Sequence, residues 1–196
     1  TTAVRSDIGL INFWYNVDLY EINWSLGMPA HINFLNENTR NPEKQTMKGI
    51  FCGGAKLEPE RQMEFEKRFR IPVYTNYGLT ETTSFATCTH PGCSQEALGS
   101  VGKALDINDI RIVTEEGKRA QPNEKGEIHI RGRNLFKEYL NKPEITKARL
   151  RDDWFYTGDF GYMDAEGNIF IVDRIDNMIL IGGENVYPAE VENIVP

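Results

Sequence analysis

Cysteine, excess basic charge and long apolar runs are all scarce in this sequence of 196 residues. It has three cysteines, and a low, odd count is typical of a reducing, cytoplasmic setting. No apolar run approaches the roughly 20 residues that span a bilayer, and acids among the first 30 residues exclude a signal peptide. Lysine and arginine total 22 against 29 acids, a net charge of −7. This balance argues against a nucleic-acid or anionic-membrane surface.

The cysteines do not form a complete metal-binding pattern. Cys88, His90 and Cys93 lie close together, but a zinc site needs a fourth ligand, and no second Cys/His pair supplies one. Cys52 and His31 are isolated. We therefore expect a loop with incidental thiols, with zinc as the less favoured alternative.

Common nucleotide and metal motifs are missing as well. The sequence has no G-x-x-x-x-G-K-[ST], no G-x-G-x-x-G and no H-E-x-x-H. It begins at Thr1 without an initiator methionine and stops at Pro196, a few residues into an expected helix. Both ends suggest a piece of a longer protein.

Residues 47–77 have the pattern of a strand, a turn, a helix and a second strand. The apolar segment 47–52 runs into two glycines, Pro59 opens a helix with acids in its first turn, and Pro72 ends it. The unit has the length of a parallel β-α-β crossover. The fold class is therefore expected to be α/β.

The pattern changes after residue 100, where short segments alternate with period two. Strands without long helices between them indicate a small antiparallel sheet or barrel. One helix is expected at 143–150, whereas the aromatic-rich segment 1–46 has mixed periodicity and no element can be assigned there. The expected strands are 107–113, 127–131, 160–164, 168–172 and 178–181.

Ligands of parallel sheets bind beyond the carboxyl ends of the strands, which here are the turns at 53–55 and 77–81. In the second turn a hydroxyl, Thr80, stands beside a carboxylate, Glu81, a combination that suits a phosphate with its Mg²⁺. Tyr77 offers a flat face for stacking. The alternative, which the residues alone favour, is a turn with a buried tyrosine and a helix-capping threonine.

A second candidate site lies in the later sheet, at residues 156–159. The Asp159 carboxylate can accept two hydrogen bonds from a vicinal diol such as a ribose, and Arg174 could return to the same place beside a phosphate. The alternatives are an aspartate in a β-turn and a surface ion pair of Arg174 with Asp173 or Asp176. The pair Gly182–Gly183 permits close approach of another backbone or a ligand.

The order and spacing of these segments resemble the adenylate-forming (AMP-binding) superfamily over residues 47–196. The ending 182–192 is similar to its acyl- and aryl-CoA synthetase branch. The segments are Tyr77-Gly78-Leu79-Thr80-Glu81-Thr82, Gly99-Ser100-Val101-Gly102, Gly126-Glu127-Ile128, Tyr156-Thr157-Gly158-Asp159 and Asp173-Arg174-Ile175-Asp176.

The resemblance implies three parts of a larger enzyme. Residues 1–100 would end the α/β part of the AMP-binding domain, 101–175 would be a β-barrel-like subdomain, and 176–196 would begin a truncated C-terminal domain. The implied activity is that of an AMP-forming acid–thiol ligase. It joins a carboxylic acid to ATP as acyl-AMP, releases pyrophosphate, and passes the acyl group to CoA. ATP, Mg²⁺ and CoA are the implied cofactors, with fatty acid metabolism in the cytoplasm as the setting.

The resemblance also implies roles for individual residues. Thr80 would bind the α-phosphate, Glu81 would hold Mg²⁺, and Arg174 would assist beside the nucleotide. Asp176 would be the hinge of the C-terminal domain, and Gly182 and Gly183 would line the CoA tunnel. The expected ATP- and AMP-binding residues are Gly53, Gly54, Ala55, Tyr77, Gly78, Thr80, Asp159, Ile171 and Arg174.

Two parts of the family pattern are absent from these residues. One is the Ser/Thr/Gly-rich loop that holds the β- and γ-phosphates, and the other is the lysine used in adenylation. A non-CoA adenylating enzyme and a catalytically inert nucleotide-binding remnant therefore remain alternatives.

We predict that these 196 residues alone do not turn over, because that loop and that lysine supply phosphate contacts. The assay is acyl-CoA synthesis by the purified chain with ATP, Mg²⁺, CoA and a panel of carboxylic acids. Measurable product would contradict the prediction.

Overall fold

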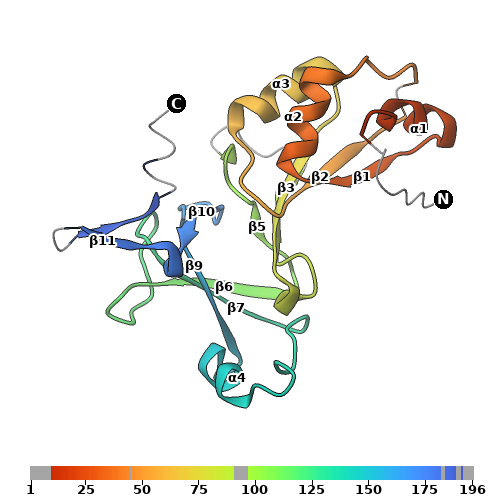
Figure 1. Cartoon of the computed structure of the whole chain (residues 1–196). Helices are drawn as coiled ribbons and strands as arrows, with labels where there is room; N and C mark the ends of the chain where they lie inside the picture. Colours follow the sequence, from red (N-terminus) through yellow and green to blue (C-terminus); the bar gives the residue numbers. More distant parts are fainter. Residues whose placement is uncertain (1–9, 45, 91–96, 182–183, 189–190, 192–196) are drawn as a thin grey trace. The chain divides into compact units, whose positions relative to one another are not determined.

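The computed structural model describes residues 10–44, 46–90, 97–181, 184–188 and 191, and these form two compact units (Figure 1). Unit 1 comprises Thr1–Asn76 and Thr89–Gly99, and unit 2 comprises Tyr77–Cys88 and Ser100–Pro196. Residues 77–88 thus pack with the later part of the chain. The expected boundaries at residues 100 and 175 stay a prediction.

Unit 1 is built on parallel strands, as the sequence predicts. Strand β2 pairs with both β1 and β3 in parallel register. The predicted strand–helix–strand unit is confirmed by β2, α3 and β3. The elements are α1 (Phe13–Tyr20), β1 (Trp24–Gly27), α2 (Pro29–Asn38), β2 (Gly49–Cys52), α3 (Pro59–Phe69) and β3 (Val73–Tyr77), which ends at the unit boundary.

Helix α3 begins and ends for the expected local reasons. Pro59 occupies its first turn together with Glu60, and basic side chains lie in its last turn. Arg70 takes a left-handed conformation at φ 55°, and its N–H caps the carbonyl of Glu66. The helix buries Phe65 and Phe69 against Trp14 of α1.

The aromatic segment that the sequence left unassigned contains α1, β1 and α2. Long-range contacts hold it: Trp14 is 2% exposed, and its indole N–H donates to Thr39. Asp18 accepts hydrogen bonds from the backbone N–H groups of Glu43 and Lys44 and from Arg40. Burial raises the pKa of Asp18, but these donors lower it by more, so it lies below its ordinary value.

Unit 2 is dominated by an antiparallel sheet in the order β10-β9-β7-β6, with β8 also paired to β9 (Figure 1). The predicted antiparallel sheet is confirmed. Its strands are β6 (Asn108–Val113), β7 (Gly126–Gly132), β8 (Leu150–Arg151), β9 (Trp154–Met163) and β10 (Ile169–Arg174). The other elements are η1 (Thr80–Thr82), β4 (Thr87–Cys88), β5 (Lys103–Ala104), α4 (Pro143–Arg149), η3 (Ile175–Asn177), β11 (Ile179–Ile181) and β12 (Glu184–Val186).

Alternation along the strands builds the core of unit 2. Ile110, Ile112, Ile128 and Ile130 point to one face of the sheet and are all buried, together with Ile169. Their neighbours in sequence point to the other face. The period-two pattern in the sequence therefore marks strands that direct their apolar side chains to one face of the sheet.

The expected cysteine–histidine loop and the expected CoA-tunnel glycines fall partly outside the described residues. Cys93 of the loop is not among the described residues, and within those residues no group of three or more His, Cys, Asp or Glu side chains is placed to hold a metal ion. Gly182 and Gly183 also lie outside them. In the same described part of the chain, no helix is long and apolar enough to cross a membrane.

The β9–β10 turn carries a carboxylate that organises it. Asp164 accepts hydrogen bonds from the N–H groups of Glu166 and Asn168, at 2.9 and 2.8 Å, and from the side chain of Asn168 at 2.8 Å. Gly167 supplies a φ of 90°. Partial burial raises the pKa of Asp164, but the donors lower it by more, so the pKa lies below its ordinary value.

We predict that Asp164→Ala lowers the free energy of unfolding by about 1–2 kcal/mol at neutral pH, because hydrogen bonds to a charged acceptor are lost. Since the folded pKa is lowered, this contribution is complete above the unfolded pKa of about 3.9 and is lost as the pH falls through the folded pKa. Urea unfolding at pH 7 and near pH 2 measures it.

The matched control is Glu166→Ala, which removes an exposed carboxylate from the same turn and is expected to change stability by less than about 0.5 kcal/mol. An equal loss for Asp164→Ala at both pH values would contradict the account of the turn.

Candidate active site

A bulge in β9 positions the central residues of the site. Glu127 of β7 pairs with Phe160 and His129 with Tyr156, so that Ile128 alone stands opposite Thr157, Gly158 and Asp159. The sequence predicted a candidate site at residues 156–159 of the later sheet, with a β-turn as the alternative. They lie instead within a strand, and bulges are devices that re-aim side chains next to active sites.

Hydrogen bonds lock the bulge in place. The Thr157 hydroxyl donates to the carbonyl of Ile128 at 2.7 Å and accepts from the N–H of Asp159 at 3.0 Å. The N–H of Gly158 donates to the Glu127 carboxylate at 3.0 Å. Thr157 and Gly158 are therefore hydrogen-bonded to β7, and Asp159 is hydrogen-bonded to Thr157.

Gly158 is required on two grounds. Its φ of 76° lies in the left-handed region, and a Cβ there would lie 2.6 Å from a guanidinium nitrogen of Arg149 and 3.2 Å from one of Arg174. Two arginines thus approach the backbone of the bulge. Arg149, the last residue of α4, was not expected from the sequence, where it reads as an ordinary basic residue in a last helical turn.

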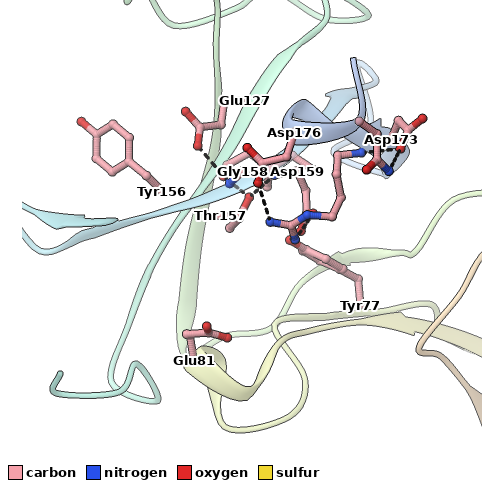
Figure 2. A network of polar contacts seen from close by, with 12 residues as sticks. Tyr77, Glu81, Glu127, Tyr156, Thr157, Gly158, Asp159, Asp173 and Asp176 are labelled. Carbon is pink, nitrogen blue, oxygen red and sulfur yellow. Dashed lines mark hydrogen bonds and ion pairs between the residues drawn. The ribbon is translucent and has the colours of Figure 1, made fainter. Parts of the chain in front are cut away.

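The bulge directs Asp159 toward Tyr77, as Figure 2 shows. Asp159 also contacts Arg174. Asp159 is 6% exposed. One carboxylate oxygen, Oδ2, accepts a hydrogen bond from the Tyr77 hydroxyl, and the other, Oδ1, accepts from Arg174 Nη1 at 3.0 Å. Arg174 lies directly opposite Asp159 in the β9–β10 register, after a second irregularity at Val172.

Burial sets the protonation behaviour of this pair. It raises the pKa of Asp159, against the lowering effects of Tyr77, Arg174 and Arg149. Burial and the carboxylate also raise the pKa of Tyr77 far above its usual range, so that its hydroxyl remains a donor. The site is a buried carboxylate with one neutral and one charged donor.

Arg174 also faces the short helix η3. Its Nη2 lies 3.7 Å from the Asp176 carboxylate, as does Nη2 of Arg149. The Asp173 carboxylate accepts from the backbone N–H of Arg174 at 2.7 Å and from the side chain of Asn177 at 2.8 Å. Arg174 thus lies beside Asp159, as the candidate ribose site predicts, and also near Asp176, as the ion-pair alternative predicts.

A cavity of about 280 Å³ adjoins the bulge. Glu127, Arg149, Gly158 and Asp176 are among the residues that line it. Burial raises the pKa of Glu127, but His129, the Gly158 N–H and Arg149 lower it by more, so the carboxylate stays charged at neutral pH. Both carboxylates and guanidinium groups thus line this cavity.

Glu81 forms a second polar centre in unit 2. It lies in η1, and its Oε1 accepts a hydrogen bond from the Tyr139 hydroxyl at 2.7 Å. Burial and this bond raise the pKa of Tyr139 to about 12, while Arg149 and Arg174 lower it. Tyr139 was missed from the sequence, because nothing local links it to a residue 58 positions earlier.

The turn between β3 and η1 is tight. A Cβ on Gly78 would lie 1.5 Å from the carbonyl oxygen of Ser84, so only glycine fits there. Thr82, rather than Thr80, closes the turn, since its hydroxyl accepts from the Leu79 N–H at 2.9 Å. Thr80 itself is exposed.

The remaining expected residues lie apart from these contacts or outside the described chain. Ile171, in β10, packs against the core of unit 2. Gly53, Gly54 and Ala55 follow β2 in unit 1, where a Cβ on Gly53 would lie 2.3 Å from the Asn76 side chain and Gly54 has a φ of 86°.

Comparison with known proteins gives a consistent result. The family model "AMP-binding enzyme" matches residues 5–140. The 2-succinylbenzoate–CoA ligase of Bacillus subtilis (strain 168) is 39% identical over 196 residues, which is all of this chain and 40% of that protein. Indoleacetate–CoA ligase of Aromatoleum aromaticum is 39% identical over 142 residues, or 72% of this chain and 28% of that protein.

Solved structures agree. The unliganded O-succinylbenzoate coenzyme A synthetase from Bacillus subtilis matches with a TM-score of 0.87 and 32% identity, covering 97% of this chain and 41% of that one. The same enzyme in complex with ATP and magnesium ion matches with a TM-score of 0.86 and 33% identity, covering 94% of this chain and 38% of that one. The chain thus spans less than half the length of these relatives, and it has their α/β fold. It belongs to the AMP-binding enzyme family.

Proposed function

We propose that this chain supplies the nucleotide-binding centre of an ATP-dependent, AMP-forming CoA ligase. The observation that carries the proposal is the network that Tyr77 and Arg174 form around the buried Asp159 carboxylate, in a member of the AMP-binding family. Each oxygen of the Asp159 carboxylate accepts one hydrogen bond here and has lone pairs left to accept another. Asp159 can therefore accept both hydroxyls of a ribose.

The neighbouring residues suit the rest of a nucleotide. The ring of Tyr77 would stack on adenine, and Ile171 would pack under the nucleoside. Arg174 would lie beside the α-phosphate, and Thr80 would donate its exposed hydroxyl to it. Gly78 allows close approach of the backbone of this turn.

Glu81 fits the role of a magnesium ligand. Mg²⁺ in such sites takes one or two carboxylates together with substrate phosphates and water, so that a complete protein cage is not required. The hydrogen bond from Tyr139 reaches only Oε1 and orients the carboxylate. Bound Mg²⁺ would offset the negative charge of the phosphates.

The proposed chemistry has two steps. The substrate carboxylate attacks the α-phosphorus of ATP, the bond to the β-phosphate bridging oxygen breaks, and pyrophosphate leaves. The CoA thiol then loses its proton and attacks the acyl carbon, and AMP leaves. This chain's residues hold the ribose and the α-phosphate in position and stabilise charge there. Asp176 would act as the hinge between the two steps, with Gly182 and Gly183 at the CoA tunnel.

We propose an aromatic carboxylic acid as the substrate. The relatives are named for 2-succinylbenzoate, indoleacetate and ferulate, all aromatic acids. The sequence alone left the substrate open, and these names favour an aromatic acid over the fatty acid metabolism that the family resemblance implied. A cytoplasmic location remains part of the proposal.

The full-length gene product is predicted to catalyse ATP–pyrophosphate exchange that depends on an aromatic acid and to consume CoA. The panel comprises 2-succinylbenzoate, indoleacetate, ferulate and palmitate. Exchange without CoA consumption would indicate a non-CoA adenylating enzyme. No exchange with any acid would contradict the proposal and favour an inert remnant.

In the same protein, Asp159→Ala is predicted to lower kcat/KM for ATP by about 100-fold, because two hydrogen bonds to a charged acceptor are together about 3 kcal/mol. The matched control, Glu166→Ala, removes an exposed acid from the same hairpin and should leave kcat/KM unchanged. Equal kinetics for Asp159→Ala and wild type would contradict the ribose role.

Tyr77→Phe and Tyr77→Ala separate the hydroxyl from the ring. Loss of the hydroxyl alone removes the hydrogen bond that orients the Asp159 carboxylate. It is predicted to weaken AMP binding by about tenfold, for one hydrogen bond to a charged acceptor of about 1.5 kcal/mol. Loss of the ring as well removes base stacking of about 1–3 kcal/mol, which is predicted to weaken AMP binding about tenfold further. Titration calorimetry with AMP measures both; equal affinities for the two variants would contradict stacking.

A further inference from the structure

The outer face of the β6–β7–β9 sheet carries an unusual set of side chains. In the strand register, Arg111 pairs with His129, which pairs with Tyr156, and Asp109 pairs with Arg131. These residues alternate with the buried isoleucines, so they lie on the face opposite the core. Such a face usually carries mixed charges, whereas this one combines arginines with aromatic rings.

These side chains surround a cavity of about 560 Å³. Among the residues that the structure describes, four arginines line it, and the one carboxylate in that lining is that of Asp109, which accepts from Arg131 at 2.7 Å. The arginines are Arg111, Arg119, Arg131 and Arg151. In a chain with a net charge of −7, this is a local concentration of positive charge.

Aromatic rings hold three of the guanidinium groups. Cζ of Arg111 lies 4.0 Å from the centroid of the Trp154 ring and that of Arg131 lies 4.9 Å from it. Cζ of Arg151 lies 4.8 Å from the centroid of the Tyr156 ring. Stacking fixes the plane of a guanidinium, which reduces the entropy lost on binding an anion. Arg131 also donates to Asp109, and Arg151 donates through Nε to the carbonyl of Ala148.

Polar groups in the cavity lining have unused bonding capacity. Within the described residues, Arg111 has no ion pair, and its buried Nε has no hydrogen-bond partner. His129 is 2% exposed and bonds Glu127 through Nε2 at 3.1 Å, while its buried Nδ1 has no partner in that part of the chain. Buried polar groups usually have partners, so these atoms point to a ligand.

We propose that this cavity binds a chain of two or more phosphates. Guanidinium groups match phosphate oxygens in planar, two-point hydrogen bonds, and several of them favour a ligand with several negative charges. The volume lies in the range of small-molecule sites. The cavity shares Arg151 and Tyr156 with the smaller cavity at the bulge, but its described lining does not include Tyr77, Asp159 or Arg174. It is a site additional to the proposed ribose site.

The test is titration calorimetry of sodium tripolyphosphate into the full-length gene product. The variant R111Q/R119Q removes two charges that do not line the bulge cavity and is expected to weaken binding about tenfold or more. The matched control R133Q removes an exposed arginine outside the lining of the cavity. It is expected to change the affinity by less than about twofold in about 0.1 M salt.

Three results would overturn the proposal. They are the absence of saturable binding, equal losses in R111Q/R119Q and R133Q, and unchanged binding in R111Q/R119Q. Because R111Q removes the stacking on Trp154, the single variant R119Q is measured as well. Arg119 is exposed, and R119Q is expected to weaken binding about threefold without changing the thermal midpoint.

A second titration identifies the source of the phosphates. It compares ATP with tripolyphosphate in the Asp159→Ala background, where the proposed ribose site is removed. Equal affinities would assign the site to the phosphate chain alone, whereas tighter ATP binding would assign it to a nucleotide. Both support a phosphate site, and failure of both ligands to bind would overturn it.

Discussion

A buried carboxylate between a tyrosine hydroxyl and a guanidinium is the interaction on which unit 2 depends. Asp159 draws together the end of β3 through Tyr77 and the end of β10 through Arg174, segments that lie 82 and 15 residues away in sequence. A charge this deeply buried is costly unless it is paired and hydrogen-bonded. The two partners meet that requirement, and they also fix where the carboxylate points.

The bulge of β9 converts an ordinary strand into this site. Three residues opposite Ile128 cannot follow the regular ladder, so Thr157 and Glu127 supply the hydrogen bonds that the ladder does not. Arg149 and Arg174 then approach the open side of Gly158. An acidic chain thereby places positive charge beside the carboxylate that we propose binds the ribose diol, a combination that suits a nucleotide.

Periodic segments were predictable from sequence, and features made by distant residues were not. The β2–α3–β3 unit and the antiparallel strands of unit 2 follow from local patterns of proline, glycine and apolar spacing. Helices α1 and α2 depend on contacts such as Trp14 with Thr39, which no local pattern reveals. Tyr77, Asp159 and Arg174 were candidates because of their residue types, but the bulge, Arg149 and Tyr139 required the fold. The Tyr139–Glu81 contact spans 58 residues.

The central claim is that Asp159 recognises the two hydroxyls of a ribose. Calorimetric titrations of AMP, 2′-deoxy-AMP and 3′-deoxy-AMP into the full-length gene product and its Asp159→Asn variant test it most directly. The account predicts that the wild type loses about tenfold in affinity for each missing hydroxyl and that Asp159→Asn discriminates far less, since a hydrogen bond to a charged acceptor exceeds one to a neutral acceptor by about 1 kcal/mol. Equal discrimination by both proteins would contradict the claim.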